Sequence, residues 1–373
     1  MSKGILALED GTILEGRGFG YPCEVHGEVV FNTGMVGYCE SLTDPSYCGQ
    51  ILVQTWILLG NYGVPSYSIT DKFGIPLNFE SEHIQVKGYV VYSLSDKPSH
   101  WSSIKSLNDW LYDQKIPGIE GIDTRELTKK LRAKGVMLGI LKVADEIDVD
   151  EVKEKIKTIE DPNKRDLVKE VTISEPLNYK IGGATTVVLI DCGVKFGILR
   201  NLLARNVNVI RVPYDYSVEK ILEYNPSGIV VSNGPGDPKK CEKTIETIKQ
   251  LMETNLPMLG ICMGHALFAL ASGADTYKLK FGHRGQNHPV IDLFTNRCYI
   301  TSQNHGFAVD GDSLKRTDFD VWFINANDKT IEGLKHAKKP IFSTQFHPEA
   351  SPGPYETEFL FDEFLERLRK CQG

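Results

Sequence analysis

The feature that most constrains the fold is an alternation, in the second half of the chain, between apolar runs of strand length and helix-forming stretches. The runs "TTVVLIDCG", "VNVIRVP", "GIVVSNG" and "PMLGIC" alternate with stretches such as "KFGILRNLLARN" and "EKTIETIKQLMETN". Strands that alternate with helices form βαβ units, in which the strands lie parallel and are buried on both faces. We therefore expect an α/β fold over residues 184–373, built on a doubly wound, mostly parallel sheet. The final stretch "YETEFLFDEFLERLRK" predicts a helix packed on that sheet, because four apolar side chains share one face: Phe361, Phe364, Leu365 and Leu368.

Residues 1–143 differ from the second half in composition. They are rich in Gly, Tyr and Ser and contain short β-prone runs such as "GEVVFNTG" and "VKGYVVYSL", which predict a smaller, mixed, β-rich N-terminal domain. One helix is expected in "DTRELTKKLRAKG", with Asp123 as its N-cap and Gly135 as its end. The segment 144–183 is densely charged and predicts a solvated helix and linker between the two domains.

Composition excludes several classes of function. The chain has 373 residues, 41% hydrophobic and 24% charged, as expected of a globular protein with two domains. A net charge of −7 gives no reason to expect a nucleic acid or a membrane as partner, and no apolar run is long enough to cross a bilayer. Eight cysteines without a C-x-x-C pair argue against a zinc cage and a disulfide framework, so we expect a cytoplasmic protein without a metal.

Cys262 lies in the segment "GICMG", which has the glycine spacing of the G-x-S-x-G nucleophile elbow with sulfur in place of oxygen. Glycines at 260 and 264 allow a strand to turn sharply into a helix and hold the side chain between them exposed. The N–H groups at the start of that helix would favour the thiolate. An inert cysteine in a βα turn that needs glycines explains this motif equally well.

His347 and Glu349 decide between those two interpretations. A thiol nucleophile needs a general base, and the base needs a group that orients it. The two residues follow the run "PIFSTQF" two positions apart, so that both can point to the same side at the end of a strand. Singly they are a turn histidine and a surface acid. Together with the elbow they predict a cysteine-dependent acyl transfer enzyme.

Longer motifs extend this interpretation to a family. The segments "GPGDP", "GIC-G-" and "HPE", in this order, resemble those of the class I (triad) glutamine amidotransferases. Over nearly the whole chain, "NTGMVGY-ESLTDPSY--QI", "GIDTRELTKKLR", "FGHRGQNHPV", "TSQNHGFAV" and "QFHPE" resemble the small, glutaminase subunit of carbamoyl-phosphate synthetase. In some eukaryotes the same unit is fused to the synthetase. The N-terminal half is the part that other amidotransferases of the class lack.

The resemblance implies a reaction and the residues that perform it. The chain would hydrolyse L-glutamine to glutamate and ammonia and pass the ammonia to a synthetase for carbamoyl phosphate synthesis, in pyrimidine or arginine biosynthesis or both. Cys262 would attack the carboxamide, His347 would transfer the proton, and Glu349 would orient His347. Backbone N–H groups of Met263 and Gly234 would bind the oxyanion. The expected contacts with glutamine are Ser46, Gly234, Gly236, Met263, Asn304, Gly306 and Phe307.

The resemblance also implies a partner. The chain has no G-x-x-x-x-G-K-[ST] loop, so ATP, bicarbonate and Mg²⁺ are expected only on a large synthetase subunit or a fused synthetase domain, with no cofactor in this chain. Ala266 stands where the family usually has glutamine, which puts glutamine affinity in question. Two alternatives stay open: a glutaminase-like regulatory domain with weak or no activity, and an amidotransferase that serves a different synthetase.

Overall fold

The computed structural model describes residues 2–372. By its internal contacts the chain divides into two compact units, Met1–Arg165 and Asp166–Gly373. The division falls inside the segment 144–183 that the sequence predicts as a linker. The fold class predicted for each domain is confirmed: the N-terminal domain is β-rich, and the C-terminal domain is α/β.

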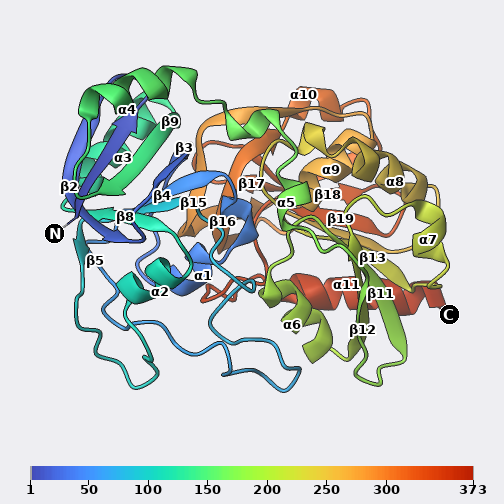
Figure 1. The fold of residues 1–373 in the computed structure, drawn as a ribbon. Helices are drawn as coiled ribbons and strands as arrows, with labels where there is room; N and C mark the ends of the chain where they lie inside the picture. Colours follow the sequence, from blue (N-terminus) through green and yellow to red (C-terminus); the bar gives the residue numbers. More distant parts are fainter. Residues whose placement is uncertain (1, 373) are drawn as a thin grey trace. The chain divides into compact units, whose positions relative to one another are not determined.

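The first unit is built on a closed barrel whose strands follow one another in the order β1-β2-β8-β6-β4-β3-β9 (Figure 1). The pairs β3/β4, β4/β6 and β6/β8 are parallel and the remaining pairs are antiparallel, so the barrel is mixed. A separate two-stranded sheet joins β5 (Leu58–Leu59) and β7 (Ser93–Leu94). The barrel strands are β1 (Lys3–Leu8), β2 (Ile13–Gly20), β3 (Glu24–Asn32), β4 (Gln50–Gln54), β6 (Gly88–Val90), β8 (Pro117–Glu120) and β9 (Met137–Ala144).

The helices of the first unit follow local sequence signals. Helix α3 (Thr124–Lys134) begins and ends as predicted: the Asp123 carboxylate accepts a hydrogen bond from the N–H of Glu126 at 2.9 Å, and Gly135 is the C-cap. The charged segment is less solvated than expected, because α4 (Val149–Lys155) buries Val152 against the barrel. The other two helices are α1 (Tyr38–Leu42) and α2 (Leu107–Asp113).

The second unit contains a ten-stranded sheet in the order β10-β12-β11-β13-β14-β19-β18-β17-β15-β16. Its centre, from β12 to β19, is parallel as predicted. Strand β10 adds to one edge antiparallel, and β18, β17, β15 and β16 extend the other edge antiparallel. The strands are β10 (Leu177–Tyr179), β11 (Thr185–Asp191), β12 (Val207–Pro213), β13 (Gly228–Val231), β14 (Met258–Ile261), β15 (Thr276–Asp292), β16 (Cys298–Val309), β17 (Phe319–Asn325), β18 (Ile331–His336) and β19 (Ile341–Thr344).

Helices cover both faces of this sheet. Helices α8 (Glu242–Met252) and α9 (Met263–Ala271) pack together on one side, and α6 (Phe196–Ala204) and α11 (Phe359–Gln372) lie on the other (Figure 1). The predicted apolar face of α11 is buried, and its side chains pack so closely on β13 that a Cβ at Gly228 would lie 2.4 Å from Leu368. Three short helices are α5 (Val168–Val171), α7 (Val218–Leu222) and α10 (Gly311–Leu314).

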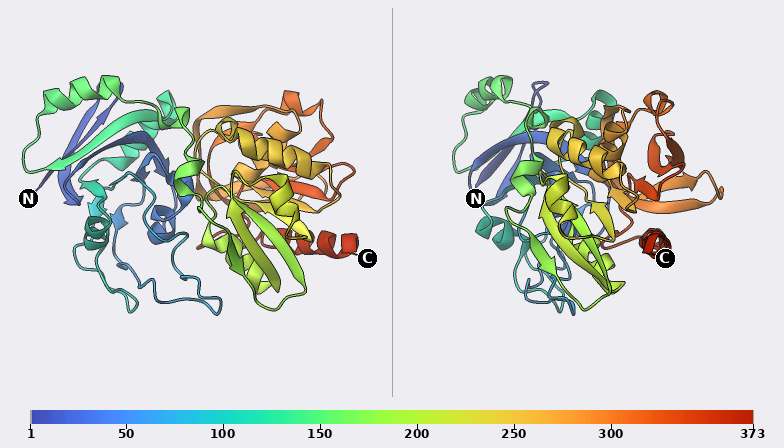
Figure 2. Two further views of the ribbon diagram at one scale, coloured as in Figure 1. Left: turned by 45° about the vertical axis from the view of Figure 1, so that its right-hand side comes forward. Right: turned by 90° about the vertical axis from the view of Figure 1, so that its right-hand side faces the viewer.

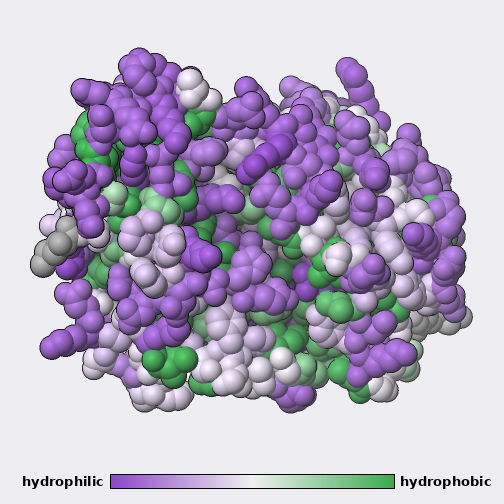
Figure 3. Space-filling view, viewed as in Figure 1, coloured by the Kyte–Doolittle hydropathy of each residue, from purple (hydrophilic) through white to green (hydrophobic). Residues whose placement is uncertain are grey.

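The antiparallel extension is the part of the fold that the sequence does not predict. The long hairpin of β15 and β16 projects from the sheet and appears in orange in the right-hand view of Figure 2. Hydrophilic residues cover most of the molecular face drawn in Figure 3, and hydrophobic ones are scattered among them. Among the described residues no helix is both long and apolar enough to span a bilayer.

Candidate active site

Cys262 lies at a sharp corner between β14 and α9. Its backbone has φ 53° and ψ −97°, a conformation that costs a residue other than glycine about 1–3 kcal/mol and is typical of functional sites. The flanking glycines are required by contact: a Cβ at 264 would lie 2.3 Å from the carbonyl oxygen of Val231, and a Cβ at 260 would lie 2.7 Å from that of Gly264. The geometry is that of a strand-to-helix elbow.

The Cys262 thiol is buried and has two polar neighbours. Its Sγ lies 3.7 Å from the carbonyl oxygen of Asn304, to which it can donate, and 3.7 Å from the side-chain Nε2 of Gln345, from which it can accept. Met263 is the first residue of α9, so its N–H is one of those that a helix leaves without an internal partner. A donor and a nucleophile are therefore adjacent at the start of this helix.

His347 and Glu349 lie just beyond β19, which ends at Thr344. The N–H of Cys262 bonds to the carbonyl of Thr344 at 2.8 Å, which fixes the elbow to the end of β19. Nδ1 of His347 lies 2.6 Å from Oε1 of Glu349. The other ring nitrogen, Nε2, is buried without a hydrogen-bond partner. Nε2 can therefore accept the proton of a thiol and later donate it to a leaving group.

The Glu349 carboxylate has a positive group on either side. Burial and the nearby ammonium of Lys195 disfavour a protonated imidazole at His347, but Glu349 and Cys262 outweigh them and raise the pKa of His347 to about 10. Burial acts against the Glu349 carboxylate too, yet the ammonium of Lys195 and the imidazole lower the pKa of Glu349 to about 2. Nζ of Lys195 lies 3.2 Å from Oε1 of Glu349, and both side chains are buried. The site thus holds a charged acid and a proton-bearing histidine beside the thiol.

Sequence reasoning missed Lys195 and Gln345. Lys195 follows β11 at the carboxyl edge of the sheet, where α/β proteins bind their ligands, but nothing in its local sequence marks it as a partner of Glu349. Gln345 stands two residues before His347, so the alternation that paired His347 with Glu349 would have included it if extended by one step.

Besides Met263 at the start of α9, the predicted oxyanion and glutamine residues of the second unit lie in one loop and one strand. After β13, a Cβ at Gly234 would lie 2.2 Å from the carbonyl oxygen of Cys192, and Gly236 has φ 84°, so both positions require glycine. Asn304, which contacts the Cys262 thiol, lies in β16 with two further predicted contacts, Gly306 and Phe307.

Ser46 belongs to the first unit. It is buried in the 3-10 helix Pro45–Tyr47, which Asp44 caps by accepting a hydrogen bond from the Ser46 N–H at 2.9 Å. Asp44 is therefore the residue that caps this turn. The contact of Ser46 with glutamine stays a prediction.

Potential metal ligands gather elsewhere in the second unit. Within residues 2–372, His283, His305 and Glu332 form a group that could hold a metal ion. All three lie in the antiparallel extension of the sheet, and none belongs to the group around Cys262.

Comparison with known proteins identifies both units. The family model of the carbamoyl-phosphate synthase small chain, CPSase domain, matches residues 6–141, and that of class-I glutamine amidotransferases matches residues 188–367. The carbamoyl phosphate synthase small chain of Methanopyrus kandleri is 48% identical over 99% of both chains, and that of Methanocaldococcus jannaschii is 50% identical over 98% of both. The multifunctional protein CAD of Squalus acanthias is 49% identical over 98% of this chain and 16% of its own length. The chain belongs to the family of carbamoyl phosphate synthase small chains, with a class-I glutamine amidotransferase domain as its second half.

Proposed function

We propose that Cys262, His347 and Glu349 form the catalytic triad of a glutamine amidotransferase, the glutaminase component of carbamoyl phosphate synthase. The observation that carries this assignment is the elbow at Cys262 with a carboxylate-bound histidine beside the thiol. Family membership supplies the substrate, L-glutamine, and the destination of the ammonia, a synthetase that makes carbamoyl phosphate.

In the first half-reaction the Cys262 thiolate attacks the carbon of the glutamine carboxamide. The resulting oxyanion would accept hydrogen bonds from the N–H groups of Met263 and Gly234, a type of interaction worth about 3 kcal/mol in a transition state. His347 carries the proton that came from the thiol and gives it to the leaving nitrogen, so that ammonia departs and a γ-glutamyl thioester remains.

In the second half-reaction water hydrolyses the thioester. His347, now neutral, takes a proton from the water as its oxygen attacks the thioester carbon, and the Cys262 sulfur then leaves as a thiolate. Glutamate is released and the thiolate–imidazolium pair is restored. Glu349 holds Nδ1 throughout, and its negative charge stabilises the imidazolium at each stage at which His347 carries the proton.

We assign the binding of glutamine in the second unit to Asn304, whose carbonyl faces the thiol, to Gly306 and Phe307 on the same strand, and to Gly236, which shares a loop with Gly234. Ser46 of the first unit is a further proposed contact, and this assignment rests on the family resemblance alone. We assign ATP, bicarbonate and Mg²⁺ to the synthetase partner, which is either a separate large subunit or a fused domain. We also propose a cytoplasmic location. All eight cysteines are free thiols, as is usual in a reducing compartment.

The test replaces the nucleophile. Cys262→Ser should abolish glutamine hydrolysis and glutamine-dependent carbamoyl phosphate synthesis, while the assembled synthetase still uses added ammonia. Cys298→Ser is the matched control, because Cys298 is an exposed thiol of the same unit. Glutaminase turnover in Cys262→Ser near that of the control would refute the assignment of the nucleophile.

A second measurement addresses the partner. The isolated chain is expected to hydrolyse glutamine slowly, and a saturating synthetase partner to accelerate it, because a ligand that binds one conformation better shifts the population toward it. Equal turnover with and without the partner would count against coupling. A chain that is inactive in both conditions would instead favour a regulatory domain.

A further inference from the structure

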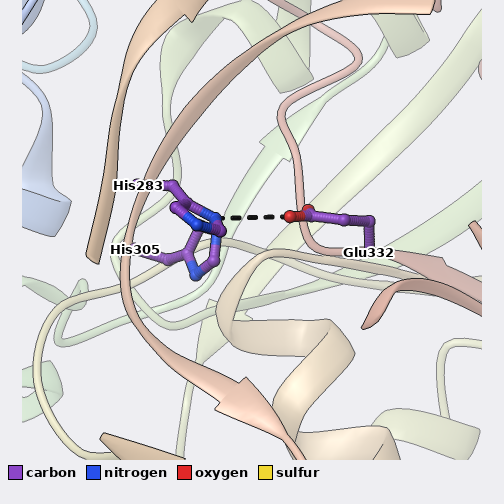
Figure 4. A group of neighbouring side chains, drawn as sticks. All are labelled: His283, His305 and Glu332. Carbon is purple, nitrogen blue, oxygen red and sulfur yellow. Dashed lines mark ion pairs between the residues drawn. The ribbon is translucent and has the colours of Figure 1, made fainter. Parts of the chain in front are cut away.

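Two histidines and a glutamate from three different strands meet in the antiparallel part of the sheet (Figure 4). His283 of β15 and His305 of β16 face each other as register partners, and Glu332 comes from β18. Their exposed fractions are only 6%, 7% and 0%, and the atoms that could bind a metal all lie within 4.8 Å of one another. The sequence gives no metal-ligand spacing here, because the three residues come together only when the sheet forms.

Each imidazole is held at one nitrogen by a group that only accepts hydrogen bonds. Nε2 of His283 lies 2.8 Å from Oδ2 of Asp328, and Nδ1 of His305 lies 2.8 Å from the carbonyl oxygen of Phe307. These nitrogens therefore carry the hydrogens, and in a neutral ring the other nitrogen carries a lone pair. Metal-binding histidines show this pattern, in which a carboxylate or a carbonyl fixes the nitrogen that does not bind the metal.

The remaining atoms have few partners. Nδ1 of His283 lies 3.4 Å from Oε1 of Glu332, which is an ion pair when the ring carries two protons, but in a neutral ring this nitrogen has no hydrogen-bond partner. Oε2 of Glu332 has no hydrogen-bond partner either. Nε2 of His305 lies 3.1 Å from Oε1 of Gln303, a second contact in which both atoms accept when the ring is neutral. Buried polar atoms without partners are costly and rare. A cation among these atoms would give each lone pair a positive partner.

The ligand set and its spacing favour zinc. Two imidazole nitrogens and a carboxylate oxygen are ligands of zinc, which binds them at about 2.0–2.1 Å in tetrahedral geometry. In such a tetrahedron neighbouring ligand atoms are about 3.3 Å apart, close to the 3.4 Å between His283 and Glu332. We propose that His283, His305 and Glu332 bind a divalent zinc ion, with a small shift of the His305 ring and with Gln303 or water as the fourth ligand.

The ion would act as a positioning element. Oε1 of Glu332 accepts a hydrogen bond from the side-chain amide of Asn325 at 3.1 Å, so the carboxylate is already oriented. His305 directly follows Asn304, whose carbonyl faces the Cys262 thiol. Zinc at His305 would therefore tie β15, β16 and β18 together and fix the strand that lies beside the nucleophile.

The first experiment measures metal in the full chain, purified without a histidine tag and without chelators. Elemental analysis should find about one zinc per chain, as for other structural sites of this ligand type. Removal of the metal, followed by titration with cobalt(II) in the Cys262→Ser background, should give the visible bands of tetrahedral cobalt without a contribution from that thiol. Less than about one tenth of an equivalent of metal, together with no cobalt bands, would mean that the cluster is a protonated histidine between two carboxylates and would overturn the proposal.

The second experiment assigns the ligands. Glu332→Gln keeps the shape of the side chain and removes its charge, and it should weaken cobalt binding by about 100-fold or more, since even outer-shell changes cost 10- to 100-fold. His336→Gln is the control, because this histidine lies on the same strand and outside the cluster. Circular dichroism verifies that both variants fold. Unchanged cobalt affinity and bands in Glu332→Gln would place the metal elsewhere and refute the site.

Discussion

Two histidines of the second unit are almost completely buried: His347 in the segment after β19, and His265 in the first turn of α9. Their pKa values are shifted in opposite directions. His265 has the Ser343 hydroxyl 2.9 Å from Nδ1 and no charged neighbour that offsets its burial, which lowers the pKa of His265 to about 3. Burial acts on His347 in the same direction, yet Glu349 and Cys262 raise its pKa to about 10. The comparison shows that burial alone makes a histidine inert, and that a buried carboxylate partner makes it a proton carrier.

The largest expected effect is on kcat, which should fall when His347 is replaced but not when His265 is replaced. His347→Asn should lower kcat for glutamine hydrolysis by about 10³-fold or more, because the thiol loses its base and the departing ammonia loses its acid. His265→Asn can keep the hydrogen bond to Ser343 and should change kcat no more than a few-fold. Steady-state kinetics of the two variants test this contrast, and equal losses would show that His265 also takes part in the reaction.

The second effect concerns Glu349, the carboxylate that His347 has as a partner and His265 lacks. In Glu349→Gln the imidazolium of His347 loses its main electrostatic support, so the pKa of His347 should fall. The alkaline limb of the pH profile of kcat/KM should then move to lower pH, and activity at neutral pH should fall by about 10²- to 10⁴-fold. A profile that keeps its shape and loses only amplitude would mean that Glu349 acts in folding and not in setting the charge of His347.

The sequence predicts the parts of this site whose signals are local. Glycines at 260 and 264 indicate the elbow around Cys262, and apolar runs indicate the strands that position it. Lys195 and Glu332 carry no such signal, because their roles arise from contacts with distant strands that exist only in the folded sheet. The antiparallel extension from β18 to β16 escaped prediction for a related reason: its strands, such as "TYKLKFGHRGQNHPVID", are half polar and lack the uniform apolar character of buried parallel strands.

A third effect follows from the opposite pKa shifts. The folded-state pKa of His265 lies below the usual value of 6.5, so protonation favours the unfolded chain, and stability is lost as pH falls from about 6.5 towards 3. The folded-state pKa of His347 lies above 6.5, so its contribution is complete below 6.5 and is lost as pH rises towards 10.

Replacing each histidine should therefore change a different limb of the stability profile. His265→Asn should remove a slope of up to about 1.4 kcal/mol per pH unit on the acid side, and His347→Asn one of the same size on the alkaline side. Urea unfolding at a series of pH values measures both. If the two variants flattened the same limb, the opposition between the two histidines would be wrong.

The smallest effect is expected one residue beyond His265, at Ala266, where the family usually carries glutamine. Ala266 lies one helical turn from Cys262, and its N–H bonds to the Cys262 carbonyl at 3.3 Å, so it shares the face of α9 that carries the nucleophile. Ala266→Gln should lower KM for glutamine several-fold, because a hydrogen bond to the substrate is worth about 0.5–1.5 kcal/mol, and kcat should change little.

The opposite outcome would be recognised by a loss of both stability and turnover. Ala266 is only 4% exposed, and if its surroundings have closed around the alanine, the longer side chain would be overpacked at a cost of about 1–3 kcal/mol. The melting temperature and kcat would then fall together, and a lower kcat without any gain in KM would show that position 266 belongs to the packing of the elbow and not to the glutamine pocket.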